Sequence, residues 1–239
     1  PEEINRIVTD SVSDFLFTTS KEAKENLLKE GIPKKKIHFV GNVMIDSLYK
    51  IKSMAEKSDI LRKLGITNKN YITLTLHRPS NVDNKIKLVN ILNAIKKIQK
   101  EIKVVFPVHP RTIKMIKKFK LITFLKNMDN LILSEPLGYL DFSKLMACSK
   151  LILTDSGGIQ EETTILNIPC LTLRENTERP VTVSRGTNTI VGSCQDKILI
   201  ETNKILSNNY RIKAKRRPEF WDGKASSRIV KVLLKTFAM

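Results

Sequence analysis

Short apolar runs recur along the chain and alternate with stretches of helical spacing. These runs are rich in β-branched residues and cover residues 15–19, 36–42, 71–77, 102–109, 131–136, 151–157 and 169–173. Such runs are typical of buried strands. Because they are apolar throughout, we expect helices to cover both faces of the sheet that they form.

The segments between the runs predict helices. Ser20 is placed to cap a helix that runs to Leu28. Residues 112–119 and 141–148 show helical spacing, as do residues 85–100. In the last of these, the spaced apolar positions are Ile86, Val89, Leu92, Ile95 and Ile98. The alternation of strands and helices predicts an α/β fold with a doubly wound parallel sheet.

Polar residues follow the apolar runs, at the strand ends where ligands of such sheets bind. Two of the three histidines and several arginines and carboxylates are among them. The run ends are His77-Arg78, His109-Pro110-Arg111, Ser134-Glu135-Pro136, Thr154-Asp155-Ser156-Gly157-Gly158 and Arg174-Glu175-Asn176-Thr177-Glu178-Arg179. The sequence therefore predicts that these side chains converge on one edge of the sheet.

Composition narrows the class of protein. The 239 residues are enough for one or two domains, and with 41% hydrophobic and 28% charged residues the chain is expected to fold. No apolar run approaches the roughly 20 residues that span a bilayer, and the start of the chain lacks a leader pattern, so we expect a cytoplasmic protein without membrane partners.

Three scattered cysteines predict buried thiols and neither disulfides nor a metal site. Because residue 1 is Pro and not Met, we expect a truncated or processed chain.

The formal net charge of +18 suits nucleic acid or a small anion. The lysines are scattered along helical faces, without aromatic-interleaved strands or a basic helix followed by heptads. An anionic small molecule is therefore favoured, and no nucleic-acid partner is expected.

Ser156, Gly157 and Gly158 lie between a predicted strand and a predicted helix. Small residues at this point let the free amides of the helix start approach a phosphate. Glu162, one turn further, is placed to accept hydrogen bonds from ribose. The alternative is an ordinary capped turn. The spacing GxGxxG of nicotinamide sites and the GK[ST] of P-loops are both missing.

Three further strand ends carry candidate ligand-binding residues. An imidazole beside a guanidinium, His77 with Arg78, suits an anionic leaving group, although a hydrogen-bonded strand-end histidine would give the same pattern. His109 is a second strand-end histidine of this kind, and a turn at the following proline would explain its position equally well. Arg179 follows another run and is expected to face the ligand, the alternative being a solvated loop.

Nine segments in order resemble the UDP-N-acetylglucosamine 2-epimerase family of the non-hydrolysing type, over nearly the whole chain. They are PEEINR, VGNVMIDSL, LHRPSN, PVHPRT, EPLGYLDF, LILTDSGGIQEE, TERP, GTNTIVG and WDGKASSRI. TDSGGIQEE followed by TERP is the most specific pair. The resemblance implies a GT-B-like fold of two Rossmann-like halves, in which this chain holds the end of the first half (residues 1–47), the UDP-binding second half (48–220) and a helix that crosses back (221–239).

The family's roles carry over onto matching positions. Phe142 would stack on uracil, Ser156, Gly157 and Gly158 would bind the diphosphate, and Glu162 would hold the ribose. His77 and Arg78 match the HR pair near the diphosphate. Glu2 and Arg6 match an element beside the sugar, where Glu3 is the less favoured carboxylate.

The implied reaction interconverts UDP-GlcNAc and UDP-ManNAc by elimination and re-addition of UDP, without cofactor or metal, in a homodimer. Glu2, Arg6 and His77 are the candidate catalytic residues. Ser80 stands where the family commonly has glutamate, which puts a regulatory UDP-GlcNAc site in doubt, and Val181 replaces another common glutamate. A hydrolysing epimerase, a GT-B glycosyltransferase and a UDP-sugar-binding half without turnover stay open as alternatives.

Overall fold

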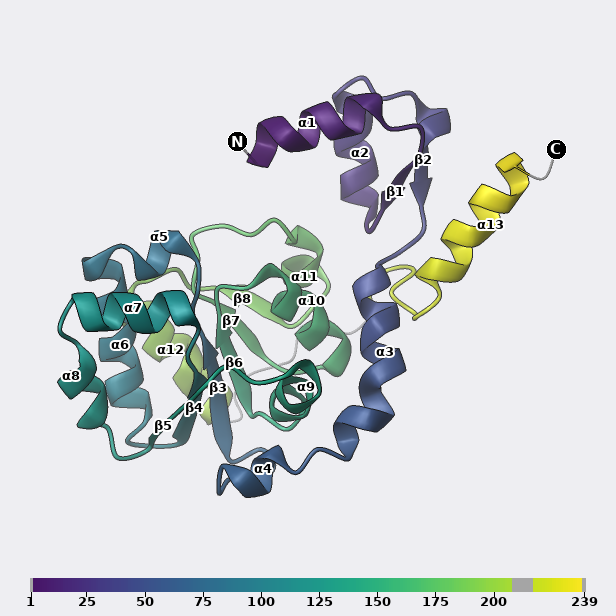
Figure 1. Cartoon of the computed structure of the whole chain (residues 1–239). Helices are drawn as coiled ribbons and strands as arrows, with labels where there is room; N and C mark the ends of the chain where they lie inside the picture. The colour runs from purple at the N-terminus through teal and green to yellow at the C-terminus, as the bar shows by residue number, and fades with distance from the viewer. Residues whose placement is uncertain (1, 208–216, 238–239) are drawn as a thin grey trace. The chain divides into compact units, whose positions relative to one another are not determined.

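The five apolar runs between residues 71 and 173 form neighbouring strands of one parallel sheet in the computed structural model (Figure 1). The strands are β3 (Tyr71–Thr75), β4 (Lys103–Pro107), β5 (Leu131–Ser134), β6 (Leu151–Thr154) and β7 (Cys170–Thr172). A sixth strand, β8 (Asn188–Ile190), pairs with β7. β8 was not predicted from the sequence, because only one of its three residues is aliphatic.

The strand order is β5-β4-β3-β6-β7-β8, so the winding direction of the chain reverses between β3 and β6. This order is that of a doubly wound dinucleotide-type sheet, in which ligands bind beyond the strand ends at the reversal. The register pairs Thr75 with Thr154 at those ends. The predicted α/β parallel fold is confirmed.

Helices cover both faces of the sheet, as expected from the buried strands. One face packs on α6 (Lys85–Ile98), α7 (Pro110–Lys118), α8 (Ile122–Lys126) and α12 (Gln195–Leu206). The other packs on α4 (Ile60–Lys63), α9 (Tyr139–Ala147) and α10 (Gly157–Leu166). The short helices α5 (Pro79–Val82) and α11 (Pro180–Ser184) follow β3 and β7 along the chain.

Three details of the sequence analysis were wrong. The buried stripe of α6 is Leu88, Ile91, Leu92, Ile95 and Ile98. Ile86 is exposed because it precedes Leu88 by two residues, about 200° around the helix, and so lies on the opposite face. The alternative of a turn at Pro110, offered for His109, does not hold, because this proline begins a helix, as Pro79 does, at the first-turn position where a missing amide costs nothing. Cys194 is exposed, since it stands at the start of α12.

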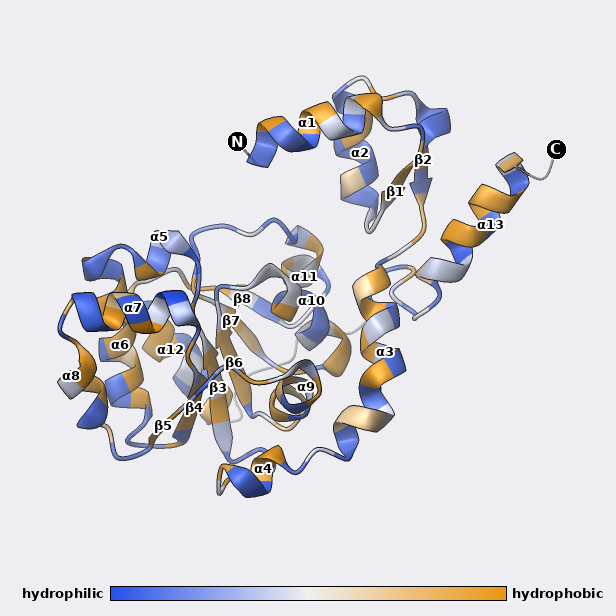
Figure 2. Ribbon diagram, in the orientation of Figure 1, coloured by the Kyte–Doolittle hydropathy of each residue, from blue (hydrophilic) through white to orange (hydrophobic). Residues whose placement is uncertain are grey.

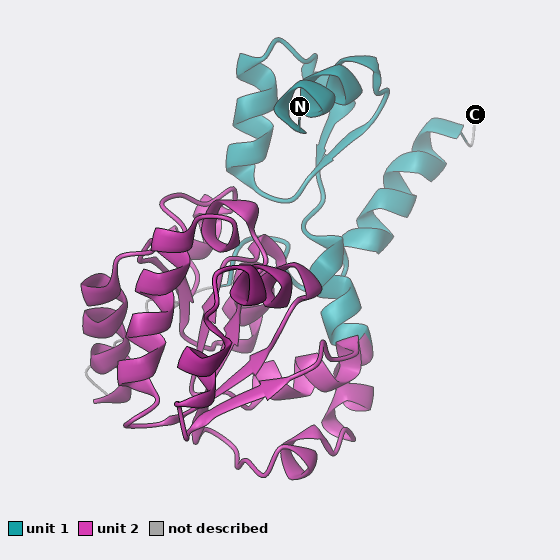
Figure 3. Cartoon of the chain, turned by 60° about the vertical axis from the view of Figure 1, so that its left-hand side comes forward, with its two compact units in different colours: residues 1–50, 217–239 teal, residues 51–216 magenta. Residues whose placement is uncertain are grey.

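The described residues, 2–207 and 217–237, fall into two units (Figure 3). Unit 2, residues 51–216, contains the six-stranded sheet. Unit 1 comprises residues 1–50 and 217–239. The assignment of residues 1–47, 48–220 and 221–239 to parts of a longer protein stays a prediction.

Unit 1 contains a two-stranded parallel sheet of β1 (Leu16–Thr18) and β2 (Ile37–Phe39). Around it are α1 (Glu2–Val12), α2 (Lys21–Lys29), a 3-10 turn η1 (Lys34–Lys36) and α13 (Ala225–Phe237), and α3 (Val43–Glu56) begins in this unit. Ser20 caps α2 as predicted, accepting a hydrogen bond from the Ala23 amide at 3.3 Å. Leu16, Leu27 and Ile37 form the small core.

The C-terminal segment is held to the rest of unit 1 by specific contacts. Buried Trp221 donates its indole N–H to the Thr19 carbonyl at 2.9 Å. The carboxylate of Asp46 accepts the first amides of α13, from Ala225 at 3.1 Å and Ser226 at 2.7 Å, and so caps that helix. Apolar positions stay exposed on α1 and α13, where Figure 2 shows them in orange. Among the described helices, none is both long and apolar enough to span a membrane.

Candidate functional site

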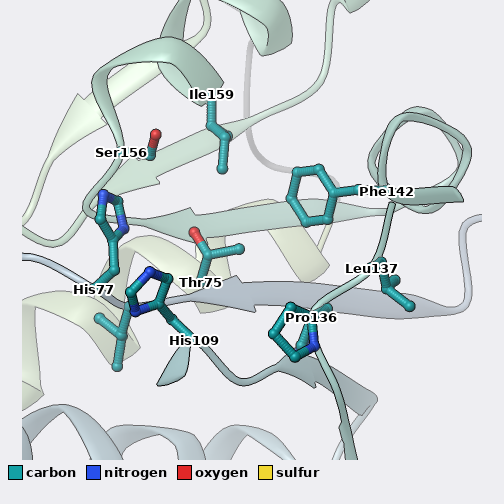
Figure 4. Close-up of a pocket in the computed structure, with 10 residues that line it drawn as sticks. Thr75, His77, His109, Pro136, Leu137, Phe142, Ser156 and Ile159 are labelled. Carbon is teal, nitrogen blue, oxygen red and sulfur yellow. The ribbon is translucent and has the colours of Figure 1, made fainter. Parts of the chain in front are cut away.

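A cavity of about 180 Å³ opens at the carboxyl ends of β3, β4 and β6, beside the reversal of the sheet. Figure 4 shows His77, His109 and Ser156 on one side of it and Phe142 with Leu137 on the other. The remaining lining residues are Thr75, Leu76, Pro107, Pro136 and Ile159. The cavity thus has a polar end and an apolar, aromatic end.

The polar end includes the start of α10. Ser156 occupies the N-cap position, but its side chain makes no capping hydrogen bond and lines the cavity instead. Neither Gly157 nor Gly158 has a positive φ, and a Cβ added at Gly158 would meet nothing within 4 Å. The fold therefore does not require glycine at position 158, whereas an anion close to the helix amides would.

The two histidines at the polar end are held by different contacts. His77 follows β3, and its backbone amide donates to the buried carboxylate of Asp155 at 3.1 Å. His109 is the N-cap of α7, where its Nδ1 accepts a hydrogen bond from the Arg111 amide at 3.1 Å. Because that nitrogen is an acceptor, the proton of neutral His109 is on Nε2. The rings have centroids 5.7 Å apart.

Glu162 lies in the second turn of α10 and is only 5% exposed. The Tyr139 hydroxyl, from the first turn of α9, donates to its Oε1 at 3.2 Å. Burial raises the pKa of Glu162 to about 7, the nearby Glu161 adds to this rise, and the Tyr139 hydrogen bond opposes it. Burial likewise raises the pKa of Tyr139 to about 12, with a further contribution from Glu162. Because Tyr139 and Phe142 share α9, Glu162 is tied to the helix that supplies the aromatic ring.

Arginines gather around Glu178, whose carboxylate would lie 3.8 Å from a Cβ at Gly157. Arg174 donates to Glu178 at 2.8 Å, and Arg78 lies 3.7 Å from it. These partners, the Arg174 hydrogen bond first, hold the pKa of Glu178 below its usual value. A carboxylate that is paired with two arginines therefore lies beside the start of α10.

Five predicted residues of unit 2 do not line the cavity, namely Arg78, Gly157, Gly158, Glu162 and Arg179. Arg179 pairs with the buried Glu161 at 2.7 Å and is absent from the lining. Glu2 and Arg6 lie on α1 in unit 1. There Arg6 pairs with Glu3, Asp10 and Glu30 at 2.6 to 2.8 Å, and these contacts, the one with Glu3 first, raise the pKa of Arg6 above its usual value.

Some residues of the site gain their importance from contacts between distant segments and had no individual role in the sequence-based prediction. Asp155 and Arg174 were predicted only to lie among the polar side chains at the run ends. Tyr139 lay in the segment EPLGYLDF without an assigned role. Within residues 2–207 and 217–237, no group of three His, Cys, Asp or Glu side chains is placed to hold a metal ion.

Comparison with known proteins gives consistent matches. The family profile described as UDP-N-acetylglucosamine 2-epimerase matches residues 1–234. A UDP-N-acetylglucosamine 2-epimerase of Methanocaldococcus jannaschii is 44% identical over 238 residues, covering 98% of this chain and 64% of the relative. One from Methanococcus maripaludis is 46% identical over 214 residues, covering 87% of this chain and 58% of the relative.

The solved structures agree with the sequence matches. The crystal structure of the Methanocaldococcus jannaschii UDP-GlcNAc 2-epimerase in complex with UDP-GlcNAc and UDP has a TM-score of 0.85 and 42% identity to this chain. The match covers 98% of this chain and 65% of that structure. This chain therefore spans a little under two thirds of the length of the proteins it matches.

Proposed function

This chain belongs to the UDP-N-acetylglucosamine 2-epimerase family, and we propose that it interconverts UDP-GlcNAc and UDP-ManNAc. The observation that carries the proposal is the two-ended cavity at the reversal of the sheet. One end offers helix amides, a hydroxyl and imidazoles to a diphosphate, and the other offers Phe142 to a base. A nucleoside diphosphate has the same two ends.

The diphosphate end suits the departure of UDP. In the first half of the reaction a base removes the C2 proton, a C1–C2 double bond forms, and the C1–oxygen bond breaks with its electron pair on UDP. The α10 amides, Ser156, His77 and Arg78 are the groups that would stabilise this charge. Re-addition of UDP to C1, with a proton delivered to the opposite face of C2, gives the epimer.

Other roles in the proposal rest on the family resemblance. Glu162 would hold the ribose, and its hydrogen bond from Tyr139, on the helix that also carries Phe142, supports this role. Glu2 and Arg6 would serve beside the sugar, and Gly157, Gly158, His109 and Arg179 would complete the binding site. The homodimer also stays a prediction.

The test is to incubate the protein with UDP-GlcNAc in D₂O and analyse the products. We expect UDP-ManNAc that carries deuterium at C2, because the proton removed there is replaced from solvent, without accumulation of free UDP. For the 239-residue chain alone we expect UDP binding but weak turnover, since its relatives are longer.

Two outcomes would contradict the proposed reaction. Free UDP that accumulates one-for-one with ManNAc would identify a hydrolysing epimerase. Turnover that appears only when a sugar acceptor is added, without deuterium at C2, would identify a glycosyltransferase. Mass spectrometry of the nucleotide sugars separates these cases.

A further inference from the structure

Asp155, at the end of β6, is a fully buried carboxylate beneath the loop that carries His77. Its Oδ2 accepts hydrogen bonds from the backbone amides of His77 at 3.1 Å and Arg78 at 3.0 Å, and from the side-chain amide of Asn81 at 3.3 Å. A buried carboxylate is stable only when donors surround it. These three donors satisfy Oδ2 and fix the course of the loop.

The other oxygen of Asp155 faces the imidazole ring. Its Oδ1 lies 2.9 Å from Nδ1 of His77, a hydrogen-bond distance. Since a carboxylate can only accept, Nδ1 must carry a proton. The remaining nitrogen, Nε2, is then the one left for the cavity that His77 lines (Figure 4).

We propose that Asp155 is a positioning residue for His77, holding the proton on Nδ1 and directing Nε2 to the diphosphate end of the cavity. A partner on one ring nitrogen is a general means of setting tautomer and ring orientation. Nε2 can then exchange a proton with a phosphate oxygen while Nδ1–H stays bonded to Asp155. The identity of the ligand rests on the proposed function, but the tautomer does not.

His109 provides a contrast within the same cavity. Its Nδ1 accepts a backbone N–H, so its neutral ring carries the proton on Nε2. The two histidines, with ring centroids 5.7 Å apart, are therefore expected to hold opposite tautomers. Arg78, the residue after His77, also carries a charge, and its guanidinium lies 3.7 Å from the Glu178 carboxylate.

The substitution Asp155→Asn should reverse the His77 tautomer with little change of shape. Oδ2 accepts the backbone amides of both His77 and Arg78, whereas Oδ1 only shares the His77 amide, at 3.1 Å. The amide oxygen of asparagine is therefore favoured at the position of Oδ2, which turns the NH₂ group towards Nδ1. Nδ1 then has to accept, and the proton moves to Nε2. Asn81→Ala is the control, because it removes a different bond to the same carboxylate, together with the Asn81 bond to the Leu173 carbonyl at 2.7 Å, and leaves the contact between Asp155 and Nδ1 in place.

The experiment is long-range ¹H–¹⁵N spectroscopy of the imidazole rings in the labelled 239-residue chain at about pH 9, where an ordinary histidine is neutral. The chain has only three histidines, so His77→Gln assigns the signals. We expect His77 to have a protonated Nδ1 in the wild type and in Asn81→Ala, and a protonated Nε2 in Asp155→Asn. A wild-type His77 protonated on Nε2 overturns the proposal, and this measurement needs no variant of Asp155 to fold.

A second measurement separates positioning from support of the loop. A charge-assisted hydrogen bond to UDP requires the doubly protonated ring, whose Nε2–H donates to a phosphate oxygen while its Nδ1–H faces Asp155. His77→Ala removes this ring and Asp155→Asn removes the carboxylate that faces it, so at about pH 6 each should weaken UDP binding roughly tenfold, the effect of one such bond. In the His77→Ala background, Asp155→Asn should add no further loss. A full additional tenfold loss there would show that Asp155 acts through the loop and would overturn the positioning role. If wild-type protein fails to bind UDP, the proposed function fails while the tautomer assignment still stands.

Discussion

Glu162 carries its carboxyl group inside the protein, and this makes its charge costly. Its pKa is raised by burial to about 7, from an ordinary value of 4.5. Between these values the folded protein binds more protons than the unfolded chain, so stability falls as the pH rises through this window. Below pH 4.5 the side chain is neutral in both states and the penalty is absent.

The substitution Glu162→Gln should therefore stabilise the protein at pH 8 relative to the wild type, with a much smaller difference at pH 5. The separation of the two pKa values corresponds to at most about 3 kcal/mol of unfolding free energy. Urea denaturation at the two pH values measures this difference. If the variant exceeded the wild type in unfolding free energy by the same amount at both pH values, Glu162 would not titrate in this window.

Helix α10 joins two motifs that lie apart in the sequence. Gln160 is fully buried, and its side-chain oxygen accepts hydrogen bonds from Thr177 at 2.6 Å and Asn188 at 3.1 Å. Its side-chain amide donates to the Ser156 carbonyl at 3.1 Å. The loop after β7 is thereby fastened to the helix start, which gives a physical reason for the pairing of TDSGGIQEE with TERP.

The start of the same helix allows a test that separates fold from binding. Because Gly158 has open space around it and no positive φ, Gly158→Ala should leave stability unchanged or raise it by up to about 1 kcal/mol. The added methyl group should weaken UDP binding roughly tenfold if phosphate oxygens approach the amides, the equivalent of a lost charged hydrogen bond.

Uridine is the control ligand for Gly158→Ala, since it lacks the diphosphate and its affinity should not change. Thermal unfolding and calorimetric titration of both ligands provide the measurements. A lower melting temperature with unaltered UDP affinity would assign this glycine to the fold and remove it from the binding site.

The whole molecule carries a formal net charge of +18, which acts on ligands before any contact forms. Raising the salt concentration from about 0.01 to 0.15 M shortens the screening distance from about 30 to about 8 Å. The association rate of UDP should therefore fall several-fold in stopped-flow experiments, whereas that of neutral uridine should stay constant. Equal salt dependence for the two ligands would contradict electrostatic steering.

The sequence by itself determined all the described strands except β8, the class of sheet, and the turn of small residues from β6 to α10. These features depend on local patterns: continuous apolar runs, helical spacing, and small residues between a strand and a helix. It also placed His77, His109 and Ser156 at strand ends, and all three line the cavity. Strand β8 was not predicted, because three residues with one aliphatic side chain form no apolar run.

Only the tertiary structure decided which polar groups meet. His77 and Asp155 are 78 positions apart in the sequence and come into contact because β3 pairs with β6. An apolar run predicts a strand but does not say which other strand it pairs with. The burial of Glu162 depends in the same way on α9 packing beside α10. Strand order and helix packing are set by the summed burial of many side chains, so the partners of a single polar residue are fixed only when the whole sheet has assembled.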